Sequence, residues 1–275
     1  MKALSSNPFE KLYSPIPDRA AYLERIGFKG YPTPTLGHLC ELMRCHLHSV
    51  PFENLDVFHG SLIPSLETED LFKKIVTDKR GGYCFELNGL FLKLLLEIGY
   101  DAFASSARII LGCNHPTPPS HEIIWVRIDG VLYFCDVGYG GPAPSGPLEF
   151  ILDKTQTDCE GGKYRFTKRH LDIVLEVKLD GEFKPMMAVN QSPCEPVDFL
   201  PLNAYCATSS TAPFLSRQMV CIHTDSGKNT INNRILRIKE NDVVTEEIIK
   251  CEDGLREALI RYFGIKYDKK LREID

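Results

Sequence analysis

The chain has 275 residues, of which 43% are hydrophobic and 10% aromatic, enough for one large domain or two to three modest ones around a buried core. Its 37 acidic and 32 basic side chains are interspersed along the sequence and give a formal net charge of −5. This balance argues against a disordered chain and shows no basic footprint for nucleic acid.

Four helices are predicted in the first hundred residues. Asp18 is a good N-cap for a helix that ends at Gly27, and Thr35 precedes an apolar stripe that Pro51 stops. Two further stripes with helical spacing follow. The four predicted helices cover residues 18–27, 35–51, 68–76 and 84–99. We therefore expect a helical bundle as an N-terminal domain over residues 1–99.

After Gly99 the pattern changes to short strands with the turn pairs Asp129-Gly130 and Asp180-Gly181, which predicts a β-barrel domain over residues 100–195. Residues 138–147 and 191–201 are rich in turn formers and are expected to be loops, the second at a domain boundary. An α/β lid domain is predicted over residues 196–275. The predicted strands are 100–110, 122–128, 131–136, 173–179, 214–223, 234–239 and 243–250, and a last helix is predicted over 254–263. The fold class is therefore α+β.

Cys84 is the strongest candidate for a nucleophile. It follows Gly81 and Gly82 and stands at the predicted start of a helix, where free N–H groups and the helix dipole favour the thiolate. Taken alone, a cysteine on an apolar helix is more often a buried core residue. A partner base is needed to decide between the two.

His121 and Asp136 supply that base through the geometry of a hairpin. If Asp129-Gly130 forms a two-residue turn, Ile128 pairs with Val131, and His121 and Asp136 project from the same face as diagonal neighbours. Such neighbours lie roughly 7–8 Å apart at the backbone, within reach of a carboxylate and an imidazole. The competing interpretation is a polar surface histidine and a strand-ending aspartate.

A cysteine, a histidine and an aspartate together make a thiol nucleophilic, because the base takes the thiol proton and the carboxylate orients the base. The same set serves thiol proteases and transglutaminases. The residues alone therefore indicate a cysteine-dependent acyl-transfer or hydrolytic enzyme.

Two other clusters carry less information. Cys40, Cys45, His46 and His48 resemble a metal-binding group, but Cys40 and Cys45 would differ by about 140° in direction on a helix, so no metal site is expected. The glycine-rich residues 138–141 would let a cofactor approach the backbone, yet equally suit a tight loop.

The location of the protein follows from its N-terminus and its cysteines. Residues 1–15 lack the apolar run of a signal peptide, and the most apolar stretch, residues 87–98, falls short of the roughly 18 apolar residues of a membrane span. Ten cysteines without an export signal are interpreted as reduced thiols. We expect a cytoplasmic protein with no membrane partner.

Four motifs resemble the arylamine N-acetyltransferase family in the family's own order. The likeness is strong over about residues 20–148 and looser beyond, where residues 209–217 resemble the family's C-terminal portion. The motifs are Tyr22-Leu-Glu-Arg-Ile-Gly27 with Pro34-Thr-Leu36, Val50-Pro-Phe-Glu-Asn-Leu-Asp56, Arg80-Gly-Gly-Tyr-Cys-Phe-Glu-Leu-Asn88 and Asp136-Val-Gly-Tyr-Gly140.

The resemblance implies the same three-part fold, with a core like that of cysteine proteases, and places the catalytic residues on Cys84, His121 and Asp136. It implies an acceptor pocket lined by Phe52 and by Tyr139, where the family usually has phenylalanine. It also puts Thr117, Gly140 and Gly141 where relatives hold the pantetheine arm of coenzyme A, and Arg80 with Glu53 where relatives have a buried ion pair that supports the active-site loop.

The activity that the resemblance implies is transfer of acetyl from acetyl-CoA to arylamines, arylhydrazines or related amines, as in xenobiotic metabolism, by a ping-pong mechanism through an acetyl-cysteine. Acetyl-CoA would be a substrate, with no permanently bound cofactor. Small molecules are the expected partners, and the oligomeric state stays open. A macrocycle-forming amide synthase of the same family, a thiol hydrolase with the same triad and a silent binding protein are the alternatives.

Overall fold

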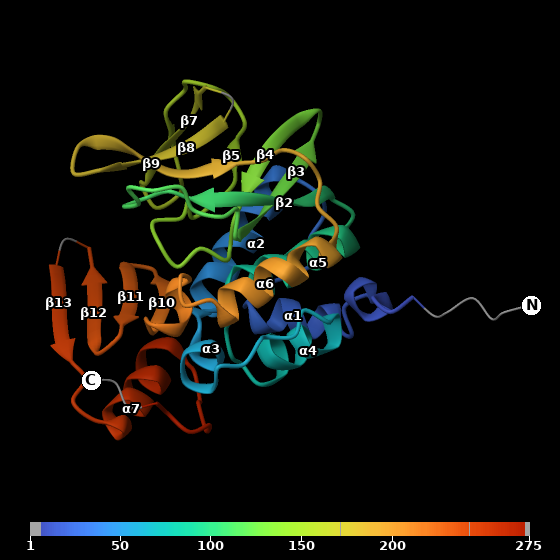
Figure 1. The fold of residues 1–275 in the computed structure, drawn as a ribbon. Coiled ribbons are helices and arrows are strands. Elements are labelled where there is room, and N and C mark those ends of the chain that lie inside the picture. The colour runs from blue at the N-terminus through green and yellow to red at the C-terminus, as the bar shows by residue number, and fades with distance from the viewer. Residues whose placement is uncertain (1–6, 171, 242, 273–275) are drawn as a thin grey trace, which may run out of the picture.

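The computed structural model describes residues 7–170, 172–241 and 243–272, so the first six residues of the segment searched for a signal peptide lie outside it. The chain forms three parts (Figure 1): N-terminal helices, an eight-stranded antiparallel sheet curved like a barrel, and a five-stranded antiparallel sheet with a helix against it. The predicted α+β class is confirmed. Within the described residues, no helix is long and apolar enough to cross a bilayer.

The helices of the first part begin and end where the sequence places their caps. The Asp18 carboxylate accepts from the amide of Ala21, the Thr35 hydroxyl accepts from the amide of His38, and Gly99 has a φ of +104°. The third predicted helix continues as a π-helical turn over Lys73–Thr77, and a short helix, α3, was not predicted. The helices are α1 Arg19–Arg25, α2 Leu36–Ser49, α3 Leu55–Gly60, α4 Thr68–Phe72 and α5 Cys84–Ile98.

The barrel-like sheet has the strand order β5-β4-β3-β2-β9-β8-β7-β6. Asp129 and Gly130 have φ values of +50° and +81°, and Ile128 pairs with Val131, as the predicted hairpin requires. Four of its strands were not predicted. Its strands are β2 Asp101–Ile109, β3 His121–Ile128, β4 Val131–Cys135, β5 Leu148–Glu149, β6 Gln156–Thr157, β7 Lys163–Arg169, β8 Asp172–Leu179 and β9 Glu182–Val189.

Strand β3 is buried on both faces, and the two faces meet different neighbours. Ile123 and Trp125 project into the barrel interior, while Ile124 and Val126 pack with the leucines of α5. Successive side chains on a strand alternate between faces. His121 therefore belongs to the barrel face of β3 and the next residue, Glu122, to the face that meets the helices.

The third part is a sheet in the order β1-β10-β11-β12-β13, so one strand from the N-terminal part, β1, completes it.

The prediction of a loop over residues 191–201 is partly wrong, because α6 begins at Phe199 and packs beside Phe85 of α5. The domain boundaries stay predictions. The remaining elements are β1 Phe52–Glu53, α6 Phe199–Thr208, β10 Met219–Thr224, β11 Gly227–Asn232, β12 Ile235–Glu240, β13 Val243–Ile248 and α7 Glu252–Phe263, of which β1, α6 and β11 were not predicted.

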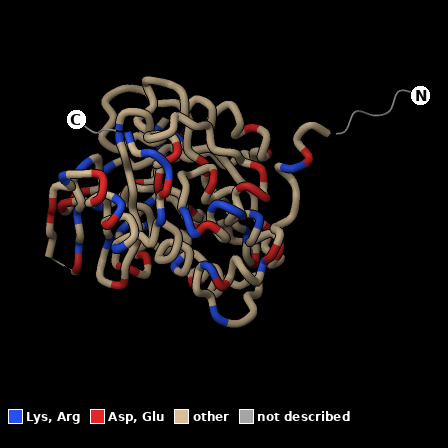
Figure 2. Tube along the Cα trace, turned by 90° about the horizontal axis from the view of Figure 1, so that it is seen from below, with Lys and Arg blue, Asp and Glu red and all other residues tan. Residues whose placement is uncertain are grey.

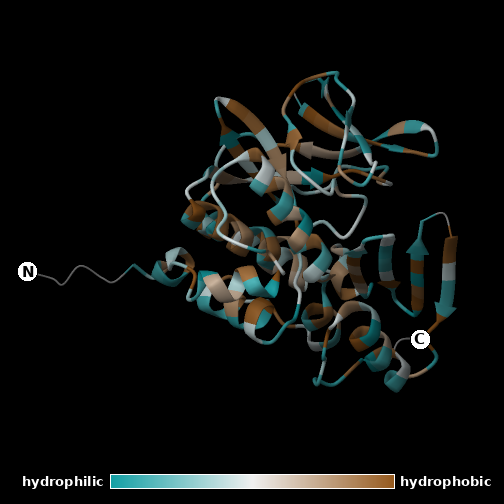
Figure 3. Cartoon of the chain, turned by 180° about the vertical axis from the view of Figure 1, so that it is seen from behind, coloured by the Kyte–Doolittle hydropathy of each residue, from teal (hydrophilic) through white to brown (hydrophobic). Residues whose placement is uncertain are grey.

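Charges of both signs are spread over the chain, and the outer strand β13 has apolar ends. Lys and Arg segments are interspersed with Asp and Glu segments along the trace (Figure 2). The outer strand β13 is hydrophobic at both ends, where Val243 and Ile248 are 66% and 63% exposed (Figure 3).

Candidate active site

Cys84 is the first residue of α5 and is only 2% exposed. The glycines before it allow the chain to pass close to β1, because a Cβ atom on Gly81 would lie 1.9 Å from the carbonyl oxygen of Pro51. The amide of Glu53 donates to the carbonyl oxygen of Gly82 at 2.8 Å. The first amides of a helix have no partner within the helix. The thiol therefore stands where backbone donors converge.

Buried ion pairs hold the loop before Cys84 in place. The guanidinium of Arg80 donates to Glu53 at 2.8 Å, and Lys74 lies 2.7 Å from Glu86 and 3.1 Å from Asp56. The other oxygen of Glu86 accepts from the amide of Tyr83 at 3.1 Å. Breaking one member of such a network leaves a buried charge without a partner, so the loop is held strongly in one geometry.

His121 and Asp136 lie side by side at the mouth of the β3–β4 hairpin. The Nε2 atom of His121 is 2.7 Å from Oδ2 of Asp136, and the two residues are 3% and 0% exposed. The registry of the hairpin puts both side chains on the barrel face. A carboxylate is an acceptor only, so the His121 proton is on Nε2 and Nδ1 is left as the basic nitrogen.

Asn88 joins this pair to the helix that carries the cysteine. One helical turn after Cys84, its Nδ2 donates to Oδ1 of Asp136 at 2.9 Å and to the carbonyl oxygen of Glu122 at 2.6 Å. Its Oδ1 accepts from the amide of Val137 at 2.9 Å. The amide of Gly138 gives Asp136 a further hydrogen bond, at 2.8 Å. The buried carboxylate is thus fully hydrogen-bonded, which is what makes its burial tolerable.

The thiol of Cys84 faces the residue that precedes His121. Its Sγ is 3.9 Å from the carbonyl oxygen of Ser120, and Sγ of Cys206 approaches the same oxygen at 3.8 Å. Burial raises the pKa of the Cys84 thiol well above its ordinary value, and the Cys206 thiol adds to the rise. The helix end alone therefore does not produce the thiolate that the sequence suggested, and a base must take the proton.

Aromatic rings surround this group. The rings of Tyr139 and His121 meet edge to face with centroids 5.5 Å apart. A Cβ atom on Gly140 would lie 2.6 Å from the Phe52 ring, and one on Gly141 would lie 2.5 Å from the Tyr139 ring. The two glycines therefore lie against the two predicted acceptor-binding residues.

The remaining predicted cofactor contact, Thr117, lies in the loop before β3. Its hydroxyl donates to the carbonyl oxygen of Ile109 at 2.6 Å. The ammonium of Lys228, from β11, donates to the carbonyl oxygen of Gly141 at 2.8 Å. The lid sheet therefore reaches the glycine pair directly.

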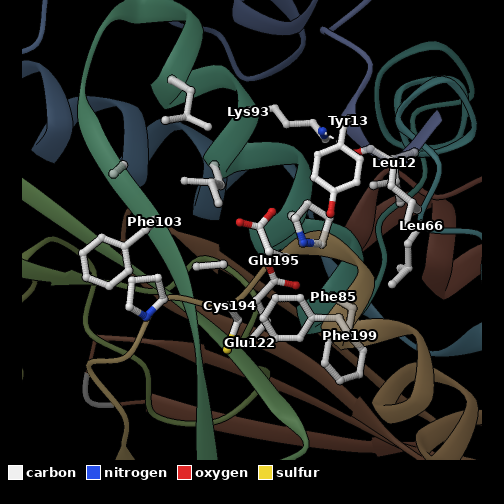
Figure 4. Close-up of a pocket in the computed structure, with 18 residues that line it drawn as sticks. Leu12, Tyr13, Leu66, Phe85, Lys93, Phe103, Glu122, Cys194, Glu195 and Phe199 are labelled. Carbon is white, nitrogen blue, oxygen red and sulfur yellow. Dashed lines mark hydrogen bonds between the residues drawn. The ribbon is translucent and has the colours of Figure 1, made fainter. Parts of the chain in front are cut away.

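A separate cavity of about 310 Å³ lies on the helical face of β3 (Figure 4). Its lining includes Phe85 and Glu122, the chain neighbours of Cys84 and His121, but none of the three predicted catalytic residues. Phe199 of α6 and Lys93 of α5 also line it. This cavity is therefore distinct from the group around Cys84.

The Cys40–His48 cluster is dispersed by α2. His46 is fully buried, with its ring edge to face against Tyr22 and Phe91 at centroid distances of 6.0 and 5.2 Å. Burial lowers the pKa of His46 to about 3, so it is a neutral core residue. His48 instead meets Glu160 and His223, which come from the other two parts of the fold.

Three residues at the site were not given a role from the sequence. Asn88 carries a usable signal, since it is four residues after Cys84 and so lies on the same side of α5. Cys206 and Lys228 are brought in by α6 and β11, neither of which was predicted, and no local pattern marks them.

Comparison with known proteins gives the same family throughout. The N-acetyltransferase family model matches residues 35–272. An arylamine N-acetyltransferase of Mycolicibacterium smegmatis is 30% identical over 253 residues, which cover 90% of this chain and 92% of that protein.

Solved structures agree with the sequence relatives. The arylamine N-acetyltransferase from M. tuberculosis has a TM-score of 0.86 and 28% identity, covering 90% of this chain and 94% of its own. The Mycobacterium marinum arylamine N-acetyltransferase in complex with CoA has a TM-score of 0.84 and 27% identity, covering 90% and 93%. The chain belongs to the arylamine N-acetyltransferase family, a family of acyltransferases.

Proposed function

We propose that the protein transfers an acetyl group from acetyl-CoA to an arylamine, an arylhydrazine or a related amine, with Cys84, His121 and Asp136 as the catalytic residues. The observation that carries the proposal is the buried His121–Asp136 pair, 2.7 Å apart, with the Cys84 thiol 3.9 Å from the carbonyl oxygen of Ser120, the residue before His121. Family membership supplies the reaction class, and the site supplies a nucleophile, a base and a group that orients the base.

In the first half-reaction His121 Nδ1 takes the proton of the Cys84 thiol, and the thiolate attacks the carbonyl carbon of the thioester. Backbone amides at the start of α5 stabilise the oxyanion. The coenzyme A thiolate leaves, takes up a proton from His121, and an acetyl-cysteine remains. Because burial raises the pKa of Cys84, the thiol stays protonated until the base acts, which limits side reactions of a free thiolate.

In the second half-reaction the amine nitrogen attacks the acetyl-cysteine, and His121 accepts the nitrogen's proton while Asp136 holds the imidazole. Arylamines are weak bases and are unprotonated at neutral pH, so their lone pair is available. Cys84 then leaves as thiolate and recovers its proton from His121. The protein itself supplies every proton transfer in the cycle.

The substrates are proposed to meet at the aromatic edge of the site. Phe52 and Tyr139 are the proposed acceptor contacts, and the hydroxyl of Tyr139 gives the pocket a polar group. Thr117, Gly140 and Gly141 are the proposed contacts of the pantetheine arm. The complex of the M. marinum relative with CoA supports CoA as a ligand of this fold. Acetyl-CoA acts as a substrate with no permanently bound cofactor.

The test is the mass of the intact protein after incubation with acetyl-CoA and no acceptor. The wild type is expected to gain one acetyl group and to lose it when 4-aminobenzoate or 5-aminosalicylate is added. Cys84→Ala is expected to gain nothing. Cys206→Ala, which removes the other thiol beside Ser120, is expected to keep the adduct.

Other outcomes separate the alternative functions. Loss of the acetyl group in water without an amine would indicate a thiol hydrolase. No adduct from acetyl-CoA, but one from a carrier-bound thioester, would indicate an amide synthase. A folded protein with no adduct from any thioester would refute the acetyltransferase proposal.

We also propose a cytoplasmic location, supported by the ten cysteines that the sequence indicates are reduced thiols. Fractionation of cells that express the tagged protein tests this, and recovery of the protein outside the cytoplasmic fraction would contradict it.

A further inference from the structure

Two histidines and a glutamate meet at a point where all three parts of the fold touch. His48 is in the last turn of α2, Glu160 is in the loop between β6 and β7, and His223 is on β10. One ligand atom from each lies within 4.8 Å of the other two. The Nε2 atom of His48 is 2.8 Å from Oε1 of Glu160, and Nδ1 of His223 is 3.0 Å from Oε2.

We propose that His48, Glu160 and His223 bind a divalent transition-metal ion of the zinc class, and that this ion fastens the helical part, the barrel and the lid sheet together. Imidazole and carboxylate are ordinary zinc ligands. The proposal does not depend on the acetyltransferase activity.

The donors lie near enough for one ion to bind after a movement of the side chains. Zinc bonds to nitrogen and oxygen are about 2.0–2.1 Å long, so two tetrahedral donors lie roughly 3.3 Å apart. The two histidines contact different oxygens of Glu160, at 2.8 and 3.0 Å, and the three ligand atoms lie within 4.8 Å of one another. Three protein ligands leave one tetrahedral position for water.

His48 gives the second, independent observation. Both of its ring nitrogens face a carboxylate, since Oδ1 of Asp225 lies 3.4 Å from Nδ1. A neutral ring carries one proton and can satisfy only one of them. With a metal on Nε2, the proton sits on Nδ1 and Asp225 accepts it, which is the usual outer-shell arrangement of a metal-bound histidine.

The loop that carries Glu160 is fixed before any ion binds. Asp158 accepts from the amides of Glu160 and Gly162 at 3.0 and 2.7 Å, and from the amide of Ser145 at 2.8 Å. His223 pairs across the sheet with Lys228, whose ammonium binds Gly141. An ion at this point would thus stabilise the contact between the lid and the proposed coenzyme A contacts.

The experiment titrates the full-length, metal-free protein with Zn²⁺ and follows heat of binding and thermal unfolding. The background is Cys84→Ser, so that zinc on the active-site thiol is not counted. One equivalent should bind, and Tm should rise by about 5–10 °C when free Zn²⁺ is a hundred times Kd. Co²⁺ in place of Zn²⁺ should give the visible spectrum of nitrogen and oxygen ligands without a thiolate band.

The variants are expected to weaken zinc binding to different extents. Glu160→Gln and His48→Gln should raise Kd for Zn²⁺ more than about 100-fold, and Asp225→Asn should raise it about 10–100-fold, as expected for an outer-shell partner. His170→Asn, which changes an exposed histidine after β7, should leave Kd unchanged. Unfolding in chelator shows whether each variant remains folded.

Two results would overturn the proposal. One is a wild-type protein that takes up no stoichiometric Zn²⁺, which would leave the three side chains as a protonated contact only. The other is binding that survives in folded Glu160→Gln but disappears in Cys159→Ala, which would place the ion on the neighbouring thiol.

Discussion

Asp136 and Glu122 are two buried acidic residues beside His121, and their surroundings have opposite effects on ionisation. Asp136 is 0% exposed and accepts hydrogen bonds from His121, Asn88 and the amide of Gly138. Glu122 is 3% exposed and faces the largely apolar cavity of Figure 4. Burial raises the pKa of Glu122 well above its ordinary value, and the charge of Asp136 adds to the rise.

The difference follows from the two faces of β3. His121 and Asp136 share the barrel face, where backbone amides and the Asn88 side chain converge. Glu122 points to the helical face, among leucines and Phe85, where Lys93 donates to the carbonyl oxygen of Leu12 at 2.7 Å. Donors make a buried carboxylate useful as an ion, and their scarcity favours a protonated acid.

The largest expected effect comes from Asp136→Asn. The amide group would donate to His121 Nε2 and hold the proton on Nδ1, the nitrogen that must act as base. We expect kcat/KM for arylamine acetylation to fall by roughly 10³–10⁴-fold. Steady-state kinetics with acetyl-CoA and an arylamine measure this.

Glu122→Gln is the matched control, since it also replaces a buried carboxyl group close to His121 with an amide. It should keep kcat/KM within about threefold, roughly 0.6 kcal/mol. If both variants lost activity equally, the loss would not depend on the contact between Asp136 and His121, and the contrast between the two acids would fail.

A smaller loss is expected from Asn88→Ala, since Asn88 positions Asp136. Its removal takes one donor from Asp136 and leaves the amide of Val137 without its acceptor. We expect kcat/KM to fall by about 10–100-fold and the acid limb of its pH profile to move to higher pH, because the carboxylate loses a stabilising hydrogen bond.

A purely structural role would lower stability without moving the pH profile. Asn229→Ala, at another buried asparagine whose Nδ2 donates to the carbonyl oxygen of Tyr262, serves as the comparison for stability loss. An unchanged pH profile of kcat/KM in Asn88→Ala would contradict the proposal that Asn88 positions Asp136.

The parts of the site that the sequence predicted are those set by local rules. The caps of α1 and α2, the start of α5 at Cys84 and the Asp129-Gly130 hairpin depend on a few neighbouring residues each. The pairing of Ile128 with Val131 fixes every later pair of the hairpin. The approach of His121 to Asp136 could therefore be derived before the fold was known.

The remaining features depend on long-range packing, which no local pattern encodes. The buried face of α6 mixes Phe199 and Cys206 with the polar Asn203, so its sequence has no clear apolar stripe. β9 carries Pro185 within the strand, where proline is disfavoured. Likewise, His48 was placed in a cluster with its helix neighbours, although its actual partners come from a distant loop and strand.

The smallest expected effect is on the free energy of unfolding. Its dependence on pH shows whether Glu122, unlike Asp136, is protonated in the folded protein. The folded-state pKa of Glu122 lies above the unfolded value of about 4.3. Below that pH both states are protonated and the side chain has no pH-dependent effect. As pH rises above it, the unfolded state ionises first, so the wild type loses stability until the folded-state pKa is reached.

Glu122→Gln removes this loss while keeping the size of the side chain. We expect the free energy of unfolding of the variant to exceed that of the wild type by roughly 1–3 kcal/mol at pH 8, with a smaller gain at pH 5.5. Urea unfolding at both pH values measures it, with Glu182→Gln at the exposed first residue of β9 as the control. A gain that is equal at the two pH values would show that Glu122 is ionised in the folded protein, and that the cavity holds a carboxylate as Asp136's surroundings do.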